Sequence, residues 1–429
     1  MKKVVKKIAL LLIVFGIGVG VTLLYTNNKY KVYEEEEPKQ IKKHVDTISM
    51  MLETEAGSGN YEMTTRSEWP TDGYIFNTTL SKCENGGELS WDDTNKRVLM
   101  SGNVSDKCYV YFDVYVPPTV VSDVCNGGET LSTCITTLSQ NSTSSYTNIY
   151  HHDSALANGA GDSSYRYSGA NPNNYVCFGS NESTCPTDNL YRIIGVFGNQ
   201  VKLIKYDYAT SALLGTDGDY ASTGTPNASY YKGSLTTINT YYWNNSTQKN
   251  TWSESLLNKT NLNTNFINNI GTEWANKIAT TTWKVGGNTY ANIRNVIPAT
   301  AYQNEIVNPV TTNTTDNATE YSAKIGLMYV SDYGFGADPS AWTTTLYNYD
   351  GSVNGSTIRS LNWMHMGYYD WTISRNADIS DIAFYVYDDG RVNNYNVNSH
   401  YAVRPSFNLE SSITYVSGSG SASDPMVIN

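Results

Sequence analysis

The pattern of apolar and polar residues divides the chain into stretches of different character. The first is Ile8–Tyr25, an apolar run without a charged residue. Beyond it, short runs of strand composition alternate with turn sequences rich in Gly, Asn and Asp. A helical period is clear at about 262–279, where Phe266, Ile270 and Trp274 recur at every fourth position. The pattern therefore predicts one long apolar segment, many short strands and few helices.

The apolar run Ile8–Tyr25 is 18 residues long, enough to cross a bilayer as a helix. Lysines at positions 2, 3, 6 and 7 precede it, so the positive-inside rule places the N-terminus in the cytoplasm. A cleaved signal peptide is an alternative, although no A-x-A-like site follows the run, and a buried core helix is another. We expect residues 1–27 to be an uncleaved signal anchor of a single-pass cell-membrane protein with extracellular C-terminal domains.

A stalk and a small β domain are expected to follow. Residues 28–44 are charged and poor in aliphatic side chains, and Glu34–Glu37 favour solvation over calcium binding. Residues 45–115 combine turn sequences with short β-rich runs. Val116-Pro-Pro is a stiff break, which indicates a linker over 116–124. Strands of the small domain are expected at 73–77, 97–100 and 108–115.

Residues 125–429 are expected to form one larger α+β domain. Its clearest element is Tyr191–Tyr206, where two β-rich runs flank Gly198-Asn199, the composition of a tight hairpin turn. The other expected elements are a helix at 262–279, a second, shorter helix at about 252–258, and strands at 282–285, 323–330, 381–387, 391–397 and 401–409.

Composition narrows the class of protein. The chain has 429 residues, of which 40% are hydrophobic, so a core can form. Charged residues make up 16%, below the usual value of about 25%, while Tyr alone numbers 35. The net charge of −11 argues against binding to nucleic acid. Polarity that comes from Asn, Ser, Thr and Tyr is more typical of an exposed surface protein than of a cytosolic enzyme.

The six cysteines fall into local pairs, which favours disulfides between neighbours in an oxidising exterior. Zinc binding is the weaker alternative because no C-x2-C spacing occurs, and free thiols are a further one. The expected bonds are Cys83–Cys108, Cys125–Cys134 and Cys177–Cys185.

The C-terminal motifs resemble a known family. Trp371-Thr-Ile-Ser-Arg375, the turn Asp389-Gly390 and Ala402-Val-Arg-Pro-Ser-Phe-Asn-Leu409 match a W-x-x-S…G-V-R-P-x-x-x-L pattern, except that Ala402 replaces the usual Gly. This pattern is similar to that of uncharacterised bacterial and phage surface domains, a branch of the C-type-lectin-like fold distantly similar to sulfatase-modifying (formylglycine-generating) domains. The likeness is best over 361–409 and extends to 190–429. The anchor and N-terminal module resemble those of surface proteins from low-GC Gram-positive bacteria.

The resemblance implies a fold more than a chemistry. Sulfatase-modifying enzymes use a cysteine pair late in the domain, and this chain has no cysteine after Cys185. Calcium-dependent lectins carry E-P-N or Q-P-D and W-N-D motifs, which are also missing. The expected fold class is therefore α+β: an N-terminal transmembrane helix, a small β domain and a C-type-lectin-like domain. No cofactor, metal or catalytic residue is expected.

An aromatic segment at 363–395 is the candidate binding site. Tyr and Trp offer large rigid contact areas with a polar tip, as in antibody paratopes and sugar-binding surfaces. Tyr385 and Tyr387 share one face of a strand because side chains alternate. Ordinary core packing is the alternative for the whole set. The candidate ligand-binding residues are Trp363, Tyr368, Tyr369, Trp371, Tyr385, Tyr387 and Tyr395.

Other polar motifs favour structural roles. Arg404, before Pro405, is expected to be a buried partner of an acid. Asp217-Gly-Asp219 and Asp388-Asp-Gly390 favour turns over calcium sites, because neither has the full spacing of a calcium loop. His151-His152-Asp153 lies among Ser, Asn and Gly, which indicates a loop rather than an acid–base site.

These features suggest a membrane-anchored adhesion protein that binds a glycan, or a protein of a host or neighbouring cell, through its Tyr/Trp-rich face. The membrane contact would be made by residues 8–25. One rival is a cell-surface carbohydrate hydrolase using carboxylates such as Asp370, Asp381 or Asp388. Another is a structural envelope or pilus-like subunit.

Overall fold

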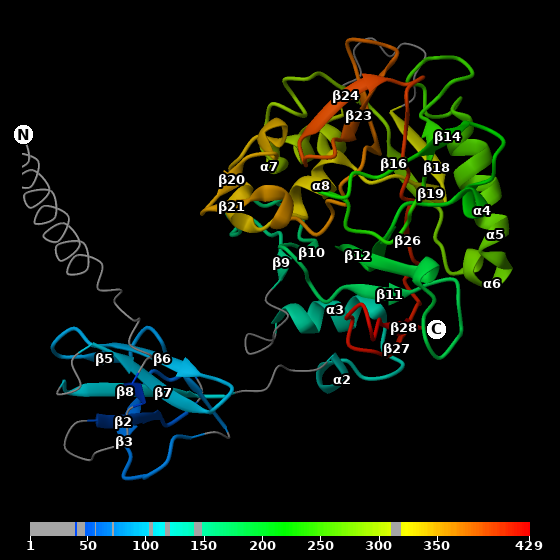
Figure 1. The fold of residues 1–429 in the computed structure, drawn as a ribbon. Helices are drawn as coiled ribbons and strands as arrows, with labels where there is room; N and C mark the ends of the chain where they lie inside the picture. Colours follow the sequence, from blue (N-terminus) through cyan, green and yellow to red (C-terminus); the bar gives the residue numbers. More distant parts are fainter. Residues whose placement is uncertain are drawn as a thin grey trace, which may run out of the picture. The chain divides into compact units, whose positions relative to one another are not determined.

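Figure 1 shows the chain in a computed structural model. The structure describes residues 39–40, 48–55, 57–70, 73–102, 106–115, 121–140, 148–309 and 319–429. The chain divides into two compact units, Met1–Pro117 (unit 1) and Pro118–Asn429 (unit 2). The expected spanning run 8–25 lies outside the described residues. Of the expected stalk, only Lys39–Gln40 is described, and it forms strand β1, which pairs with β7.

Unit 1 is built around two parallel strands, β2 (Ile48–Glu53) and β8 (Cys108–Val114). Strand β8 alternates as predicted: Val110 and Phe112 are buried, and Tyr109 and Tyr111 are half-buried. Because the inward side chains pack against Trp69 and Trp91, this small sheet has an aromatic core. The other strands of unit 1 are β1 (Lys39–Gln40), β3 (Tyr61–Met63), β4 (Tyr74–Phe76), β5 (Lys82–Cys83), β6 (Glu88–Asp92) and β7 (Arg97–Ser101).

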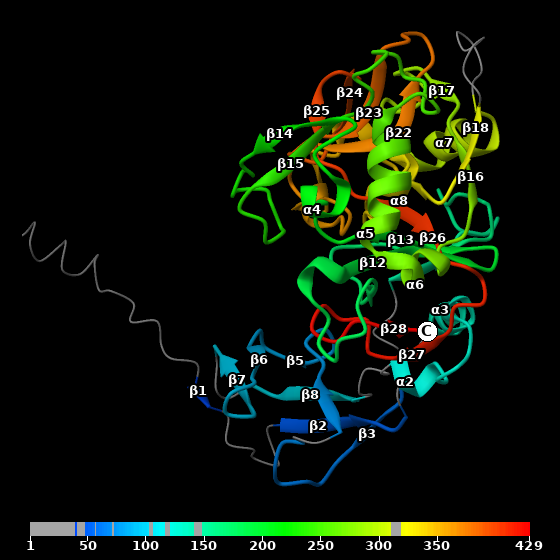
Figure 2. The same cartoon turned by 90° about the vertical axis from the view of Figure 1, so that its right-hand side faces the viewer.

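Unit 2 is layered about one sheet of strand order β19-β26-β13-β12-β10-β9, with β11 also pairing with β12. Figures 1 and 2 show helix α3 on one side of this sheet, and α8 with strands β22–β24 on the other. The predicted hairpin is confirmed as β12 and β13, antiparallel and buried almost throughout. The strands of the sheet are β9 (Ile149–His151), β10 (Tyr165–Tyr167), β11 (Tyr175–Cys177), β12 (Leu190–Phe197), β13 (Gln200–Lys205), β19 (Ile325–Gly326) and β26 (Ser406–Asn408).

Smaller sheets complete unit 2 and carry the aromatic segment. Strands β17, β22, β23 and β24 form one of them, and β14, β15 and β25 form another. Their bounds, with those of the remaining strands, are β14 (Tyr220–Gly224), β15 (Ile238–Tyr242), β16 (Thr281–Lys284), β17 (Gly287–Asn288), β18 (Glu320–Ala323), β20 (Ser352–Val353), β21 (Ser356–Thr357), β22 (Asp370–Asn376), β23 (Ile382–Val386), β24 (Val392–Asn396), β25 (His400–Tyr401), β27 (Tyr415–Ser417) and β28 (Val427–Ile428).

The helices of unit 2 are short. The longest α-helix among the described residues, α3, has 10 residues and buries Leu131, Ile135 and Leu138 at helical spacing. The helical segments are α2 (Val121–Val124), α3 (Leu131–Gln140), η1 (Thr187–Asn189), α4 (Ser211–Leu214), η2 (Leu257–Phe266), α5 (Ile267–Asn269), α6 (Gly271–Asn276), α7 (Pro298–Tyr302), η3 (Gln303–Val307), α8 (Val330–Phe335), η4 (Pro339–Ala341), η5 (Leu346–Asn348) and η6 (Ile358–Ser360).

The helix predicted at 262–279 is broken into η2, α5 and α6. Gly271 has a positive φ of 80°, which only glycine adopts readily, and it interrupts the helix. The predicted apolar stripe is still buried at Phe266 and Trp274. The shorter helix expected at 252–258 is wrong, because Trp252 lies in a turn and η2 starts only at Leu257.

Two predicted strands are also shorter than expected. The apolar run 323–330 gives only β19, and α8 begins at Val330, where the Asp332 side chain accepts a hydrogen bond from the backbone N–H of Tyr329. An apolar run buried on all sides does not distinguish strand from helix by periodicity. The run 401–409 divides into β25 and β26, which join different sheets. Pro405, which has no N–H to donate, lies between them.

The expected fold class and the expected single-pass membrane localisation are both corrected. Among the described residues, strands outnumber helices, and the helices are short. Among them, no helix has the length and apolar character needed to cross a bilayer. For the described residues, the structure therefore gives a β-rich fold in place of the expected α+β class.

The predicted disulfides are confirmed. The structure joins Cys83 to Cys108, Cys125 to Cys134 and Cys177 to Cys185. Bonds of this kind persist in oxidising compartments, which is consistent with an extracellular protein.

Candidate functional site: a tyrosine cluster

The strands β22, β23 and β25 bring together tyrosines from three segments within residues 368–401. Tyr369 lies just before β22, and Tyr385 and Tyr387 lie in and just after β23. Tyr401 belongs to β25, which reaches the same place because Ala402 bridges Asp370 in parallel. Tyr368, Tyr369, Tyr385, Tyr387 and Tyr401 are called the tyrosine cluster below.

Tyr369 is the centre of this cluster. Its ring centroid lies 4.8 Å from that of Tyr387 and 5.2 Å from that of Tyr401. The centroids of Tyr385 and Tyr401 are 4.4 Å apart. Separations of 4.5–7 Å are typical of attractive aromatic pairs, so the rings hold one another in place. A rigid aromatic surface loses little conformational entropy when a ligand binds.

Burial divides the seven predicted ligand-binding residues into two groups. Trp363, Trp371 and Tyr385 are 2%, 0% and 3% exposed, and therefore lie in the core. Each tryptophan donates its indole N–H to a backbone carbonyl. Trp363 donates to the carbonyl of Tyr167 at 2.8 Å, and Trp371 donates to the carbonyl of Tyr241 at 2.9 Å. Both tryptophans therefore belong to the core that underlies the accessible tyrosines. The accessible part of the predicted set is Tyr368, Tyr369 and Tyr387, which are half-buried, and Tyr395, which is 53% exposed.

The hydroxyls of Tyr369, Tyr385 and Tyr401 are uncharged at physiological pH. A hydrogen bond with Tyr387, followed by burial, raises the pKa of Tyr369. Burial raises the pKa of Tyr385 to about 12 and raises that of Tyr401 further. Neutral phenols both donate and accept hydrogen bonds, so the cluster offers adaptable polar contacts beside its rings.

Two arginines that sequence reasoning missed border the tyrosines. Arg391 places its guanidinium 4.9 Å from the ring centre of Tyr387 and forms an ion pair of 2.8 Å with Asp389. Arg294 lies 4.7 Å from the ring centre of Tyr347 and donates to Asn393 at 2.5 Å. Arg391 could have been found from the sequence, because it alternates with Asn393 and Tyr395 and therefore lies on the same face of the chain. No local signal indicated Arg294, which comes from a distant segment.

Two of the three carboxylates proposed for a hydrolase, Asp370 and Asp381, have structural partners. Asp370 is 2% exposed and accepts a hydrogen bond of 2.6 Å from Arg404. This confirms that Arg404 is a buried structural partner of an acid. Asp381 accepts from the Asn396 amide at 2.8 Å. Burial, then repulsion from Asp389, raises the pKa of the half-buried Asp388.

The other polar motifs form turns and caps. Asp219 is buried, and its oxygens accept backbone N–H groups of Asn245 at 3.0 Å and Leu257 at 2.8 Å. Asp389 forms the turn between β23 and β24 and accepts from the backbone of Arg391. His152 is buried within the core and accepts from the Ala160 N–H, and burial lowers its pKa to about 2. It therefore stays neutral.

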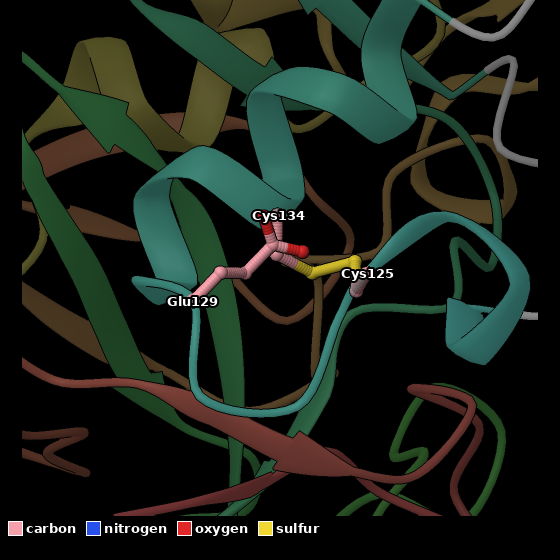
Figure 3. Close-up of side chains that lie close together, drawn as sticks. All are labelled: Cys125, Glu129 and Cys134. Carbon is pink, nitrogen blue, oxygen red and sulfur yellow. A yellow bond between two sulfur atoms is a disulfide. The ribbon is translucent and has the colours of Figure 1, made fainter.

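Figure 3 shows the cluster of metal-type side chains within the described part of the chain, formed by Cys125, Glu129 and Cys134. The two cysteines form a disulfide, so neither offers the thiolate that zinc requires. Glu129 accepts a hydrogen bond of 2.6 Å from the backbone N–H of Asn126. The disulfide therefore links the turn before α3 to Cys134 within the helix.

A second candidate feature is a cavity of about 210 Å³ between β13, β16 and α8. Lys202, Arg166 and Asp332 lie at this cavity, and all three are at least nine-tenths buried. Half of its other lining residues are aromatic or apolar (Phe197, Trp283, Tyr302, Ile306 and Tyr329) and half are polar (Thr281, Thr282, Lys284, Ser331 and Asn408). Buried charges of this kind need close partners, and their pairing is described below.

Comparison with protein-family models, with curated proteins and with solved structures finds no match to this chain. The resemblance to C-type-lectin-like surface domains therefore stays a prediction.

Proposed function

We propose that this chain is an extracellular binding protein that recognises a glycan through the accessible tyrosines beside β22–β24. The observation that carries the proposal is the tyrosine cluster, in which Tyr369 and Tyr387 are half-buried and fixed by ring contacts. The disulfides support an extracellular setting.

The chemistry of the surface suits a sugar. The apolar face of a pyranose ring stacks on an aromatic ring, and its hydroxyls need partners that both donate and accept. Tyrosine hydroxyls and the amide of Asn393 both donate and accept, and the guanidinium of Arg391 adds donors close to them. The local charge is mixed, because Arg391 is paired with Asp389, so a strongly charged ligand is not required.

The test is a screen of the purified full chain against a glycan array and a protein array, each with and without a chelator. We expect specific glycan binding that resists chelation, because the carboxylates of the Asp turns are used as caps. Binding to proteins alone would move the proposal to a protein ligand. Binding lost with the chelator, or no binding at all, would contradict it.

A further inference from the structure

A lysine and an aspartate meet inside unit 2 in an unusual setting. Lys202 lies on β13 of the central sheet and Asp332 lies on α8, which packs over that sheet (Figures 1 and 2). The Lys202 Nζ and the Asp332 Oδ2 are 2.5 Å apart, and the two side chains are 6% and 3% exposed. The residues are 130 positions apart in sequence. The fold therefore holds an amine against a carboxyl group, away from bulk water.

Aromatic rings surround the amine. The Nζ of Lys202 lies 4.5 Å from the ring centre of Tyr329, 5.3 Å from that of Trp283 and 5.7 Å from that of Phe197. Burial lowers the pKa of Lys202, although the attraction of Asp332 opposes this effect. Burial therefore favours the neutral, nucleophilic form of the Lys202 amine, whose proton can pass to the carboxyl group that it contacts.

The carboxyl group of Asp332 is held by further donors. The backbone N–H of Tyr329 donates to Oδ2 at 3.0 Å, and a guanidinium nitrogen of Arg166 lies 3.6 Å from Oδ1. Arg166 is itself fixed, since its guanidinium lies 4.7 Å from the ring centre of Phe197 and ion-pairs with Asp162 at 2.6 Å. These contacts fix the position of the Asp332 carboxyl group, and the positive charge of Arg166 lies on the side of Oδ1.

A second buried acid lies beside the pair. Glu305 is 4% exposed, and its oxygens accept the backbone N–H groups of Val330 and Ser331. It interacts electrostatically with both Lys202 and Asp332, and burial raises its pKa. Glu305 can therefore carry a proton next to the amine and the carboxyl.

We propose that Lys202 and Asp332 become joined by an intramolecular amide bond. The neutral Nζ attacks Cγ of the protonated carboxyl; the Nζ–Cγ bond forms, the Cγ–Oδ2 bond breaks, and the hydroxyl leaves as water with one proton of the amine. Nothing is oxidised or reduced, and no co-reactant is needed. The adjacent cavity of about 210 Å³, which both residues line, gives the water a place to go.

Proximity is what makes this condensation feasible. An amine and an acid do not condense readily in water, but well-oriented intramolecular groups reach effective concentrations of about 10⁵–10⁸ M. Such a bond would join the central sheet to α8 and, unlike the disulfides, would survive reducing conditions. Covalent closure of so long a loop restricts the unfolded chain and thereby stabilises the fold.

The test is mass spectrometry of the purified full chain after denaturation, reduction and alkylation. We expect a mass lower than the sequence mass by one water, and a branched peptide that links the Lys202 segment to the Asp332 segment after proteolysis. Separate, unmodified Lys202 and Asp332 peptides would overturn the proposal. A lost water that maps to any other residue, such as an Asp-Gly turn, would also overturn it.

Two variants complete the test. Lys202→Arg keeps the positive charge but cannot form the amide, so its mass should return to the full sequence mass. Lys205→Arg is the matched control: Lys205 is buried on the same strand but donates to the backbone carbonyl of Asp188 at 3.0 Å. That variant should keep the branched peptide. If Lys202→Arg does not fold, the branched peptide of the wild-type chain still decides the question.

Discussion

Arg404 and Asp370 show how single residues organise the region of the tyrosine cluster. The guanidinium of Arg404 donates to Asp370 at 2.6 Å and to the backbone carbonyl of Met364 at 2.6 Å. Asp370 begins β22, and its neighbours Tyr369 and Trp371 exchange backbone hydrogen bonds with Ala402. This pair therefore fixes the base from which the tyrosines project.

The protonation of Asp370 makes stability depend on pH. Burial outweighs the effect of Arg404 and raises the pKa of Asp370 to about 6. A carboxyl whose folded-state pKa exceeds its unfolded-state value of about 4 stabilises the fold fully below that value, and the contribution is lost as pH rises through about 6.

We therefore expect Asp370→Asn to remove about 1–3 kcal/mol of pH-dependent stability between pH about 4 and about 6. Urea unfolding of the wild-type chain and the variant at a series of pH values measures the difference. The same fall in unfolding free energy in both proteins would show that another group is responsible.

Amide side chains explain how a chain with few charges forms a large core. The Asn250 amide donates to the backbone carbonyls of Asn376, Ile379 and Ile382. Asn258 and Asn261 are buried and donate to carbonyls in the same way. Buried backbone groups need partners, and asparagine supplies them without the cost of burying a charge. The composition indicated an unusual polarity but not this internal use of it.

At the level of elements, the sequence predicted best where a local pattern decides the structure. The hairpin β12–β13 and the alternating strand β8 followed from turn composition and period. The disulfide pairs followed from spacing alone. The start of α8 did not, because it depends on Asp332 accepting from the Tyr329 backbone within an apolar run.

The disulfide of unit 1 gives a prediction at the scale of elements. Cys83 and Cys108 join β5 to β8 across a sequence separation of 25. Restriction of the unfolded chain by a loop of this size is worth about 3.5 kcal/mol in the chain-entropy account. We expect Cys83→Ser with Cys108→Ser to lower the protection of β8 amides against hydrogen exchange by about that free energy.

The matched control is Cys177→Ser with Cys185→Ser, which removes a disulfide from unit 2. It should leave the exchange of the β8 amides unchanged. Unchanged exchange in the unit 1 variant as well would mean that the β2–β8 sheet does not depend on its disulfide.

At the scale of the whole molecule, the candidate site depends on contacts between three separate segments of the C-terminal part of the chain. Tyr369, Tyr387 and Tyr401 come from three elements, and only the first two belonged to the predicted set. Trp363 and Trp371 had the same aromatic character, yet they are buried. Composition located the aromatic segment, but which rings reach the surface is set by how the small sheets pack on the central one.

The most direct test of the binding proposal is the dissociation constant of the strongest array ligand for the wild-type chain and for Tyr387→Ala with Tyr395→Ala. Loss of these two accessible rings should raise the constant at least about tenfold, since interface tyrosines commonly contribute more than about 1 kcal/mol each. Tyr115→Ala removes a tyrosine that is 46% exposed in unit 1 and should leave the constant unchanged. An unchanged constant for the double variant, with its fold retained by circular dichroism, would contradict the account.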